Sequence, residues 1–141
     1  MTDRPFAGAK LMLFAGPDLV ALERDFAPGL VWPGMLDFPG GAREGTESPT
    51  DCALRETHEE LGLRLDPAQL RLAHLRDVNG RRNWFFAAHL PARVTQDVVF
   101  GGEGAGWRVM PPRDFVGHPG AIPHFRAILR AWLDRSGWVH A

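Results

Sequence analysis

The stretch GGAREGTESPTDCALRETHEELGL, residues 40–63, places six acidic side chains close together in the sequence. They are Glu44, Glu47, Asp51, Glu56, Glu59 and Glu60. Like charges three or four residues apart on a helix repel one another and lower its stability. A positively charged partner that offsets this repulsion is therefore expected.

The second half of this stretch has the sequence signals of a helix. Ser48 suits the N-cap and Pro49 the first helical position, while Asp51 lies in the first turn, where the helix dipole favours an acid. Gly62 is a plausible end of the helix. One face carries residues at helical spacing and should meet the core. Its members are Ala53, Leu54, Thr57 and Leu61.

The acids of this predicted helix are spaced so that three of them share one face. Glu56, Glu59 and Glu60 stand at positions i, i+3 and i+4. Hard divalent cations such as magnesium prefer oxygen ligands and would offset the repulsion. Arg55 could orient one acid through a charge-assisted hydrogen bond. The alternative is a solvated acidic surface, which is the commoner reason for such a pattern.

Most of the remaining chain reads as short strands, followed by one amphipathic helix. Strands are expected at Ala9–Gly16, Leu19–Phe26, Met35–Phe38, Leu70–Val78, Asn83–Leu90 and Trp107–Met110. Asn79–Arg82 has turn composition, and Pro91–Val98 reads as a loop. The last helix lies within Pro123–Gly137, with apolar residues at helical spacing. They are Phe125, Ile128, Leu129, Trp132 and Leu133. The sequence shows no repeat or linker, which predicts one domain over residues 1–141.

Composition excludes several classes of protein. The chain has 141 residues, of which 45% are hydrophobic, so a packed core is expected. A net charge of -1 gives no reason to expect a nucleic acid polymer or a membrane surface as partner. The single cysteine, Cys52, fits a cytoplasmic protein and a small core residue. Lys10 is the only lysine, so the many arginines are weak evidence for phosphate binding.

Residues 41–63 resemble the signature of the Nudix hydrolases. That signature is Gly, five residues, Glu, seven residues, Arg-Glu, an aliphatic residue, any residue, Glu-Glu, any residue, Gly and an aliphatic residue. The positions that match without a gap are Gly41, Glu47, Arg55, Glu56, Glu59, Glu60, Gly62 and Leu63. Thr57 stands at the first aliphatic position and is a mild departure. The segment WPGMLDFPGG before the signature also looks like this family.

The resemblance implies a fold and a metal site. The fold is an α/β/α sandwich with a mixed β-sheet, formed by a single Nudix domain. The metal ligands it implies are Gly41, Glu56, Glu59 and Glu60, and the cation is Mg²⁺ or Mn²⁺. Arg55 and Glu47 would hold the helix and the preceding loop in place.

The reaction that the resemblance implies is hydrolysis of a diphosphate linkage in a nucleoside diphosphate derivative. A bound divalent metal neutralises phosphate charge and lowers the pKa of a bound water. The general base is open between Glu59, Glu60 and Glu103, the last in the glycine-rich FGGEGAGW. The alternative for Glu103 is an ordinary loop residue, because a base must lie near the attacking water and sequence does not show this distance.

Residues that bind the substrate are less well defined. Arg43 and Arg81 are candidates for phosphate contacts, and Trp84 for stacking on a base. Further candidates of the same kinds are Trp32, Phe86, Arg82 and Arg108. Core packing for the aromatic residues and a solvated surface for the arginines are the ordinary alternatives.

Three functions stay open at this point. The first is hydrolysis of nucleoside triphosphates or nucleotide sugars; the lack of tyrosine, and of proline near Val78, disfavours dinucleoside polyphosphates and ADP-ribose. The second is a regulatory domain that binds a nucleotide without cutting it. The third is a relative of isopentenyl diphosphate isomerase, for which the chain looks short. A homodimer is compatible with each.

Overall fold

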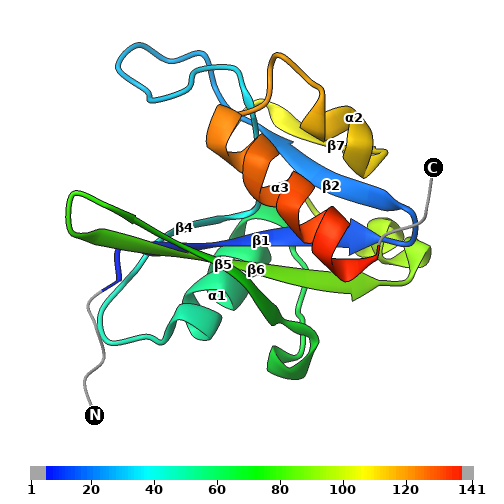
Figure 1. The fold of residues 1–141 in the computed structure, drawn as a ribbon, viewed down its shortest axis with the longest axis horizontal. Helices are drawn as coiled ribbons and strands as arrows, with labels where there is room; N and C mark the ends of the chain where they lie inside the picture. Colours follow the sequence, from blue (N-terminus) through cyan, green and yellow to red (C-terminus); the bar gives the residue numbers. More distant parts are fainter. Residues whose placement is uncertain (1–5, 138–141) are drawn as a thin grey trace.

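The apolar run near the start of the chain forms strand β1 (Gly8–Ala15), at the centre of a seven-stranded sheet (Figure 1). The computed structural model describes residues 6–137. The other strands are β2 (Asp18–Glu23), β3 (Leu36–Asp37), β4 (Gly40–Ala42), β5 (Arg71–Val78), β6 (Arg81–Leu90) and β7 (Gly106–Met110). The helices are α1 (Pro49–Leu61), α2 (Pro112–Val116) and α3 (Pro123–Ser136), with 3₁₀ helices η1 (Pro67–Gln69) and η2 (Ala92–Asp97).

The sheet is mixed, as predicted. Strand β1 runs parallel to β6 along its whole length and antiparallel to β2 and β4. The strand order is β3-β2-β1-β6-β5, with β4 attached to β1 and β7 attached to β2. The predicted turn between β5 and β6 is confirmed: Asn79 and Gly80 have φ of 53° and 76°, as a two-residue hairpin turn requires.

Strand β1 changes its antiparallel partner halfway along. Residues 8–10 pair with β4, whereas residues 13–15 pair with β2. Because β3 pairs with β2 and β4 pairs with β1, residues 37–40, the crossing segment, pass from one half of this fork to the other, with Phe38 and Pro39 between the two strands. The amide of Leu11 donates to the carbonyl of Pro39 at 2.8 Å and ties the crossing segment to β1.

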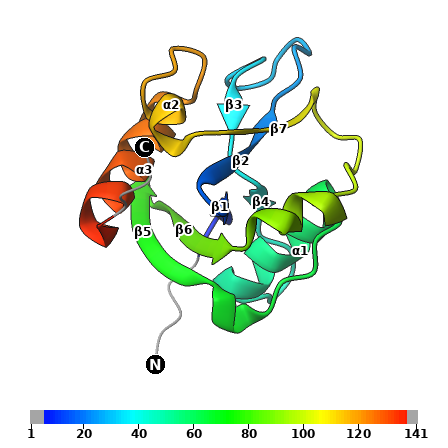
Figure 2. The ribbon, with the colours of Figure 1, turned by 90° about the vertical axis from the view of Figure 1, so that its right-hand side faces the viewer.

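Helices cover both faces of the sheet, which confirms the predicted α/β/α sandwich. Figure 2 shows α1 and α3 on opposite sides of the strands. Met12 and Phe14 of β1 belong to a buried cluster with residues of α2 and α3. Leu11 and Leu13, which point the other way, belong to a second cluster with residues of α1. Because successive side chains of β1 point to opposite faces of the sheet, this one strand contributes to both layers of the core.

Helix α1 begins and ends where the sequence predicts. The hydroxyl of Ser48 accepts a hydrogen bond from the Asp51 amide at 3.1 Å, and Gly62 closes the helix with a φ of 70°. The predicted core face is correct except at one position. Cys52 is fully buried, whereas Leu54 is only half-buried.

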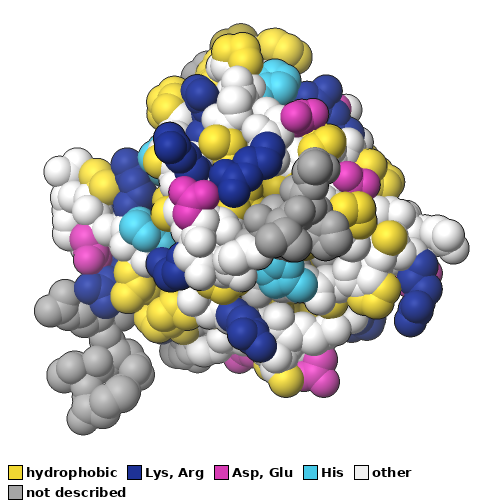
Figure 3. Space-filling view, turned by 45° about the vertical axis from the view of Figure 1, so that its right-hand side comes forward, with side chains coloured by type: hydrophobic (Ala, Val, Ile, Leu, Met, Phe, Trp, Pro, Cys, Tyr) yellow, Lys and Arg dark blue, Asp and Glu magenta, His cyan; other side chains and the backbone are white. Residues whose placement is uncertain are grey.

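Helix α3 is also as predicted, and all five of its predicted core residues are buried. Among residues 6–137, no helix combines the length and the apolar character needed to cross a membrane. The space-filling view shows basic, acidic and hydrophobic side chains interspersed on this face of the molecule (Figure 3).

Four short elements were not predicted. Strand β4 and helix η2 lie in segments predicted as loops, and the sequence indicates neither η1 nor α2. None is longer than six residues, which is too short for hydrophobic periodicity to show. Strand β4 exists because residues 40–42 pair with β1, a contact that sequence pattern alone does not reveal.

Candidate active site

Arg55 joins helix α1 to the loop that precedes it. Its Nε donates to Glu47 Oε2 at 3.0 Å and its Nη2 to Glu47 Oε1 at 2.9 Å. Nη2 also donates to the carbonyl of Ala42 at 2.9 Å. Glu47 in turn accepts from the Glu44 amide at 2.8 Å. The hydrogen bonds from Arg55 hold the pKa of Glu47 well below its ordinary value, at about 2.

The third nitrogen of the Arg55 guanidinium, Nη1, lies close to three other acids of the site. Arg55 Nη1 lies 2.6 Å from Glu56 Oε2, 3.1 Å from Glu59 Oε2 and 3.3 Å from Glu44 Oε2. Oxygen atoms of Glu44, Glu56 and Glu59 fall within 4.8 Å of one another. Glu44 was not among the predicted ligands; its position in the loop gave no helical spacing by which to find it.

Glu60 points to a different part of the site. Its Oε1 accepts a hydrogen bond from the Gly40 amide at 2.8 Å. Burial raises the pKa of Glu60 to about 7, against the lowering effect of that hydrogen bond. Burial also raises the pKa of Glu56. A bound cation would stabilise the charged forms of acids whose pKa burial raises in this way.

Gly41 and Cys52 pack against the acidic cluster from the side of the sheet. A Cβ at Gly41 would lie 2.7 Å from Glu56 Cδ, so glycine allows the carboxylate to approach the backbone. Cys52 Sγ lies 3.5 Å from the Gly41 carbonyl. Burial raises the pKa of this thiol to about 12, which agrees with its predicted role as a core residue.

Glu103 shares a cavity with Glu60. The cavity is about 240 Å³, and its lining also includes Glu23, Arg24 and Asp37. The loop that carries Glu103 is tied to the end of α1, since the Gly101 amide donates to the Glu60 carbonyl at 2.9 Å. The structure therefore brings together Glu60 and Glu103, two acids that lie far apart in the sequence.

A second cavity of about 210 Å³ adjoins the first, and Arg24 and Asp37 line both. Most of the other groups around it are aromatic, cationic or amide side chains, with the aliphatic Val31 and Ile122. Those that matter below are Lys10, Trp32, Arg76, Asn83, Phe85, His124 and Phe125. Trp32 has a φ of 54°, and its ring centroid lies 6.2 Å from that of His124. Of this set, only Trp32 was a candidate from sequence.

Three of the predicted substrate residues, Arg43, Arg81 and Trp84, lie outside both cavities. The Arg43 guanidinium stacks over Phe6, with its Cζ 4.5 Å from the ring centroid. Trp84 packs against Phe86 on the face of the sheet that α1 covers, with ring centroids 5.9 Å apart. Arg81 is exposed at the start of β6.

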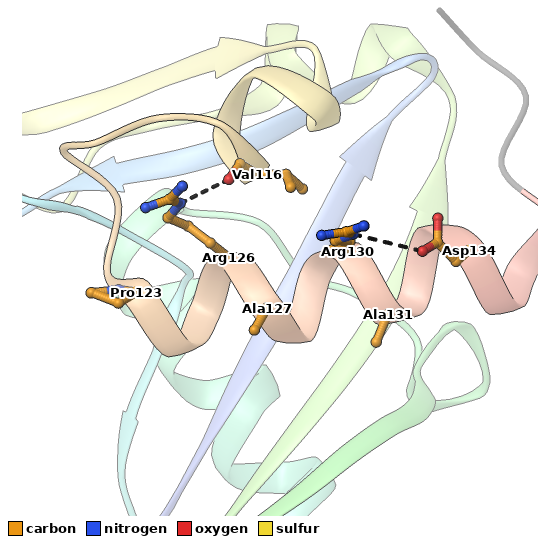
Figure 4. Close-up of a pocket in the computed structure, with 7 residues that line it drawn as sticks. All are labelled: Val116, Pro123, Arg126, Ala127, Arg130, Ala131 and Asp134. Carbon is orange, nitrogen blue, oxygen red and sulfur yellow. Dashed lines mark hydrogen bonds and ion pairs between the residues drawn. The ribbon is translucent and has the colours of Figure 1, made fainter.

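A third cavity, of about 430 Å³, lies between α2 and α3 (Figure 4). Its charged groups are engaged with neighbours. Arg126 Nε donates to the Val116 carbonyl at 2.8 Å, and Arg130 Nε lies 3.9 Å from Asp134 Oδ2. The acids of the predicted site do not line it, so we place the candidate active site at the other two cavities.

The acids present fit a hard divalent cation. Three carboxylates converge within 4.8 Å, a fourth, Glu60, is half-buried on the same helix, and all offer the oxygen donors that Mg²⁺ and Mn²⁺ accept. The positively charged Arg55 Nη1 lies within 3.3 Å of an oxygen of each of three of these carboxylates. It thereby offsets the repulsion among the acids that the sequence predicts.

Comparison with known proteins agrees with this geometry. The family model described as "NUDIX domain" matches residues 6–133. A segment of 58 residues is 36% identical to the CTP pyrophosphohydrolase of Escherichia coli (strain K12), and it spans 41% of this chain and 43% of that protein.

Solved structures have the same fold. The MutT protein from Methanosarcina mazei Go1 has a TM-score of 0.73 and 17% identity, covering 99% of this chain and 100% of its own. A mutT/nudix family protein from Listeria innocua has a TM-score of 0.75 and 18% identity over 96% of both chains. A C. elegans Ap4A hydrolase has a TM-score of 0.66 and 17% identity, covering 96% of this chain and 100% of its own. The family model, the acidic helix and the fold agree, and this chain belongs to the NUDIX domain family.

Proposed function

We propose that this protein is a divalent-metal-dependent hydrolase that cleaves the diphosphate linkage of nucleoside triphosphates. The observation that carries the proposal is the pair of adjoining cavities that share Arg24 and Asp37. One contains the acids Glu60 and Glu103, and the other is bordered by aromatic rings. A nucleotide has the same two parts, a charged phosphate chain and a flat base.

The cavity that Glu60 and Glu103 line suits the phosphate chain, and the cluster of Glu44, Glu56 and Glu59 outside its lining suits the cation. Glu56, Glu59 and Glu60 would hold Mg²⁺ or Mn²⁺, and Glu44 lies close enough to add an oxygen. Gly41 would present its backbone to the same place. A bound cation neutralises phosphate charge and lowers the pKa of water.

Glu103 is our choice for the general base. It comes from a separate loop and lines the same cavity as Glu60, so it can accept a proton while Glu56, Glu59 and Glu60 serve as ligands. The oxygen of the attacking water forms a bond to phosphorus, and the bond from that phosphorus to the bridging oxygen breaks. Arg55 keeps the loop and the helix in register during these steps.

The second cavity suits the base. Trp32, Phe85 and His124 offer aromatic surfaces, and Asn83 offers an amide that can hydrogen-bond to a base edge. Burial lowers the pKa of His124, and this favours the neutral imidazole, in which one ring nitrogen donates a hydrogen bond and the other accepts one. Cytosine is a reasonable first test, since the curated relative is named a CTP pyrophosphohydrolase.

The test is a panel of ribonucleoside and deoxyribonucleoside triphosphates and nucleotide sugars, each with Mg²⁺ or Mn²⁺. Chromatography and ³¹P NMR identify the products. We expect release of pyrophosphate and a nucleoside monophosphate from at least one triphosphate. Trp32→Ala should raise KM several-fold with little change in kcat, with Trp84→Ala as the matched control. Binding of nucleotides without turnover would instead support the regulatory domain.

A further inference from the structure

Lys10, the only lysine in the sequence, lies on β1 at the fork of the sheet. We propose that Lys10 is a positioning residue for the metal site, which holds the crossing segment of residues 37–40 so that the Gly40 amide faces Glu60. Nothing in the Nudix signature includes this position, since the signature begins at Gly41.

The contacts of the ammonium support this role. Lys10 Nζ lies 3.1 and 3.2 Å from the two carboxylate oxygens of Asp37, 3.3 Å from the carbonyl of Phe38 and 3.2 Å from the carbonyl of Gly40. One side chain thus contacts three of the four residues that cross the fork. An ammonium has three N–H donors that point in different directions, which suits acceptors spread around it.

Gly40 connects Lys10 to the acidic site. Its carbonyl accepts from Lys10, and its amide donates to Glu60 Oε1 at 2.8 Å. Its φ is 139°, and a Cβ here would lie 2.6 Å from Lys10 Cα, so the segment lies tight against β1. A shift of the Gly40 peptide would therefore move the donor that fixes the Glu60 carboxylate.

Neutralising the charge of Asp37 does not by itself account for the contacts of the Lys10 ammonium. Asp37 is buried, and Arg24 Nη1 already lies 3.1 Å from its Oδ2. Asp37 Oδ1 also accepts from the Phe38 amide at 2.7 Å. Of the two cations, Lys10 and Arg24, only Lys10 contacts the backbone carbonyls of Phe38 and Gly40 in the crossing segment.

The first test measures the Gly40 amide and needs no substrate. In Lys10→Met, we expect hydrogen exchange at the Gly40 amide to accelerate about tenfold or more relative to the amides of β6. Arg82→Met is the matched control, because it removes an ion pair to Asp77 at 2.9 Å on the distant hairpin. A smaller change at Gly40 would overturn the proposal.

A double variant separates positioning from charge balance. If Lys10 served only to offset Asp37, then Lys10→Met combined with Asp37→Asn would restore the protection of the Gly40 amide to that of Asp37→Asn alone. We expect the melting temperature to recover in the double variant while hydrogen exchange at the Gly40 amide stays fast. Recovery of both would refute the positioning role.

Chemical methylation provides a variant that keeps the charge. Reductive dimethylation leaves the Lys10 ammonium cationic but replaces two of its three donors with methyl groups. We expect faster exchange at Gly40 in the dimethylated wild type and no change in methylated Lys10→Arg, where only the α-amino group reacts. Unchanged exchange in the dimethylated wild type would show that hydrogen bonding by Lys10 is not needed.

The last experiment rests on the proposed function. In a protein that hydrolyses nucleotides, Lys10→Met should lower kcat about 10–100-fold and raise the Mg²⁺ concentration needed for half-activity, as loss of an outer support of a metal site does. Unchanged values of both would count against the proposal. If the wild type hydrolyses no nucleotide, the proposed function fails, and the exchange data still decide the role of Lys10.

Discussion

Arg55 contacts four carboxylates through its three nitrogens, and this explains how one short stretch tolerates so many acids. The sequence analysis expected a cation to offset the repulsion, and the protein supplies part of that charge itself. The acids are divided in function. Glu47 fixes Arg55, Glu56 and Glu59 converge on its Nη1, and Glu60 faces the cavity with Glu103.

At this scale we predict that Glu59→Gln or Glu60→Gln lowers kcat about 100-fold or more while the fold survives. The amide keeps the shape of the side chain but lacks the charge that a divalent cation requires. Turnover with Mg²⁺ and circular dichroism are measured on each variant. Asp97→Asn, an exposed acid outside both cavities, is the control. Full turnover in either glutamine variant would show that the assignment is wrong.

A second residue-scale prediction concerns acid stability. The pKa of Glu47 is about 2 in the folded protein against 4.5 for a free side chain, because Arg55 stabilises the charged form. The stabilisation is thus present above about pH 4.5 and is lost as the pH falls toward 2. We expect the melting temperature of the wild type to fall more steeply over this window than that of Glu47→Gln. Parallel curves would contradict the expectation.

Helix α1 shows how one element serves both the core and the site. One side packs Cys52, Ala53, Thr57 and Leu61 into the sandwich, and another presents the glutamates. The caps at Ser48 and Gly62 fix where the helix begins and ends. The spacing of the Nudix signature therefore places the glutamates at fixed positions on the helix. Among the described residues, only the Thr57 side chain has a buried oxygen without a hydrogen-bond partner.

We therefore predict that Thr57→Val stabilises the protein. Valine removes the buried hydroxyl and fills the same space, which should add about 1 kcal/mol to the free energy of unfolding and raise the melting temperature by a few degrees. Thr95→Val is the control, since it loses a hydrogen bond to the Ala92 carbonyl at 3.2 Å. A lower melting temperature for Thr57→Val would mean that the hydroxyl is satisfied in solution.

At the scale of the whole molecule, the fork in the sheet creates the site. Strand β1 pairs with β4 at one end and with β2 at the other, and the crossing segment between β3 and β4 borders both cavities through Asp37. Helix α1 supplies the acids on one side of this fork, and the first turn of α3 supplies His124 on the other. Both layers of the sandwich thus contribute to one site.

Metal binding should stabilise this whole arrangement. We predict that millimolar Mg²⁺ raises the melting temperature, because a ligand at about 100 times its Kd adds about 2.7 kcal/mol. A chelator should reverse the effect, and Glu56→Gln should reduce it. Scanning calorimetry with and without metal checks this. No shift at millimolar metal would count against the site.

The sequence by itself determined the family, the limits of α1, the core face of α3 and the mixed sheet. These follow from local signals: caps, turn residues, periodicity and the spacing of the Nudix signature. Only the tertiary structure decided which acids meet, since Glu44 joins Glu56 and Glu59 through Arg55, and Glu103 shares a cavity with Glu60. It also decided that Arg43, Arg81 and Trp84 lie away from the cavities, while Lys10 and His124 border one of them and Asp37 borders both. The reason is physical: caps and periodicity act within a few residues, whereas strand pairing brings together residues as far apart in the sequence as Leu19 and Met110, and no local pattern records that pairing.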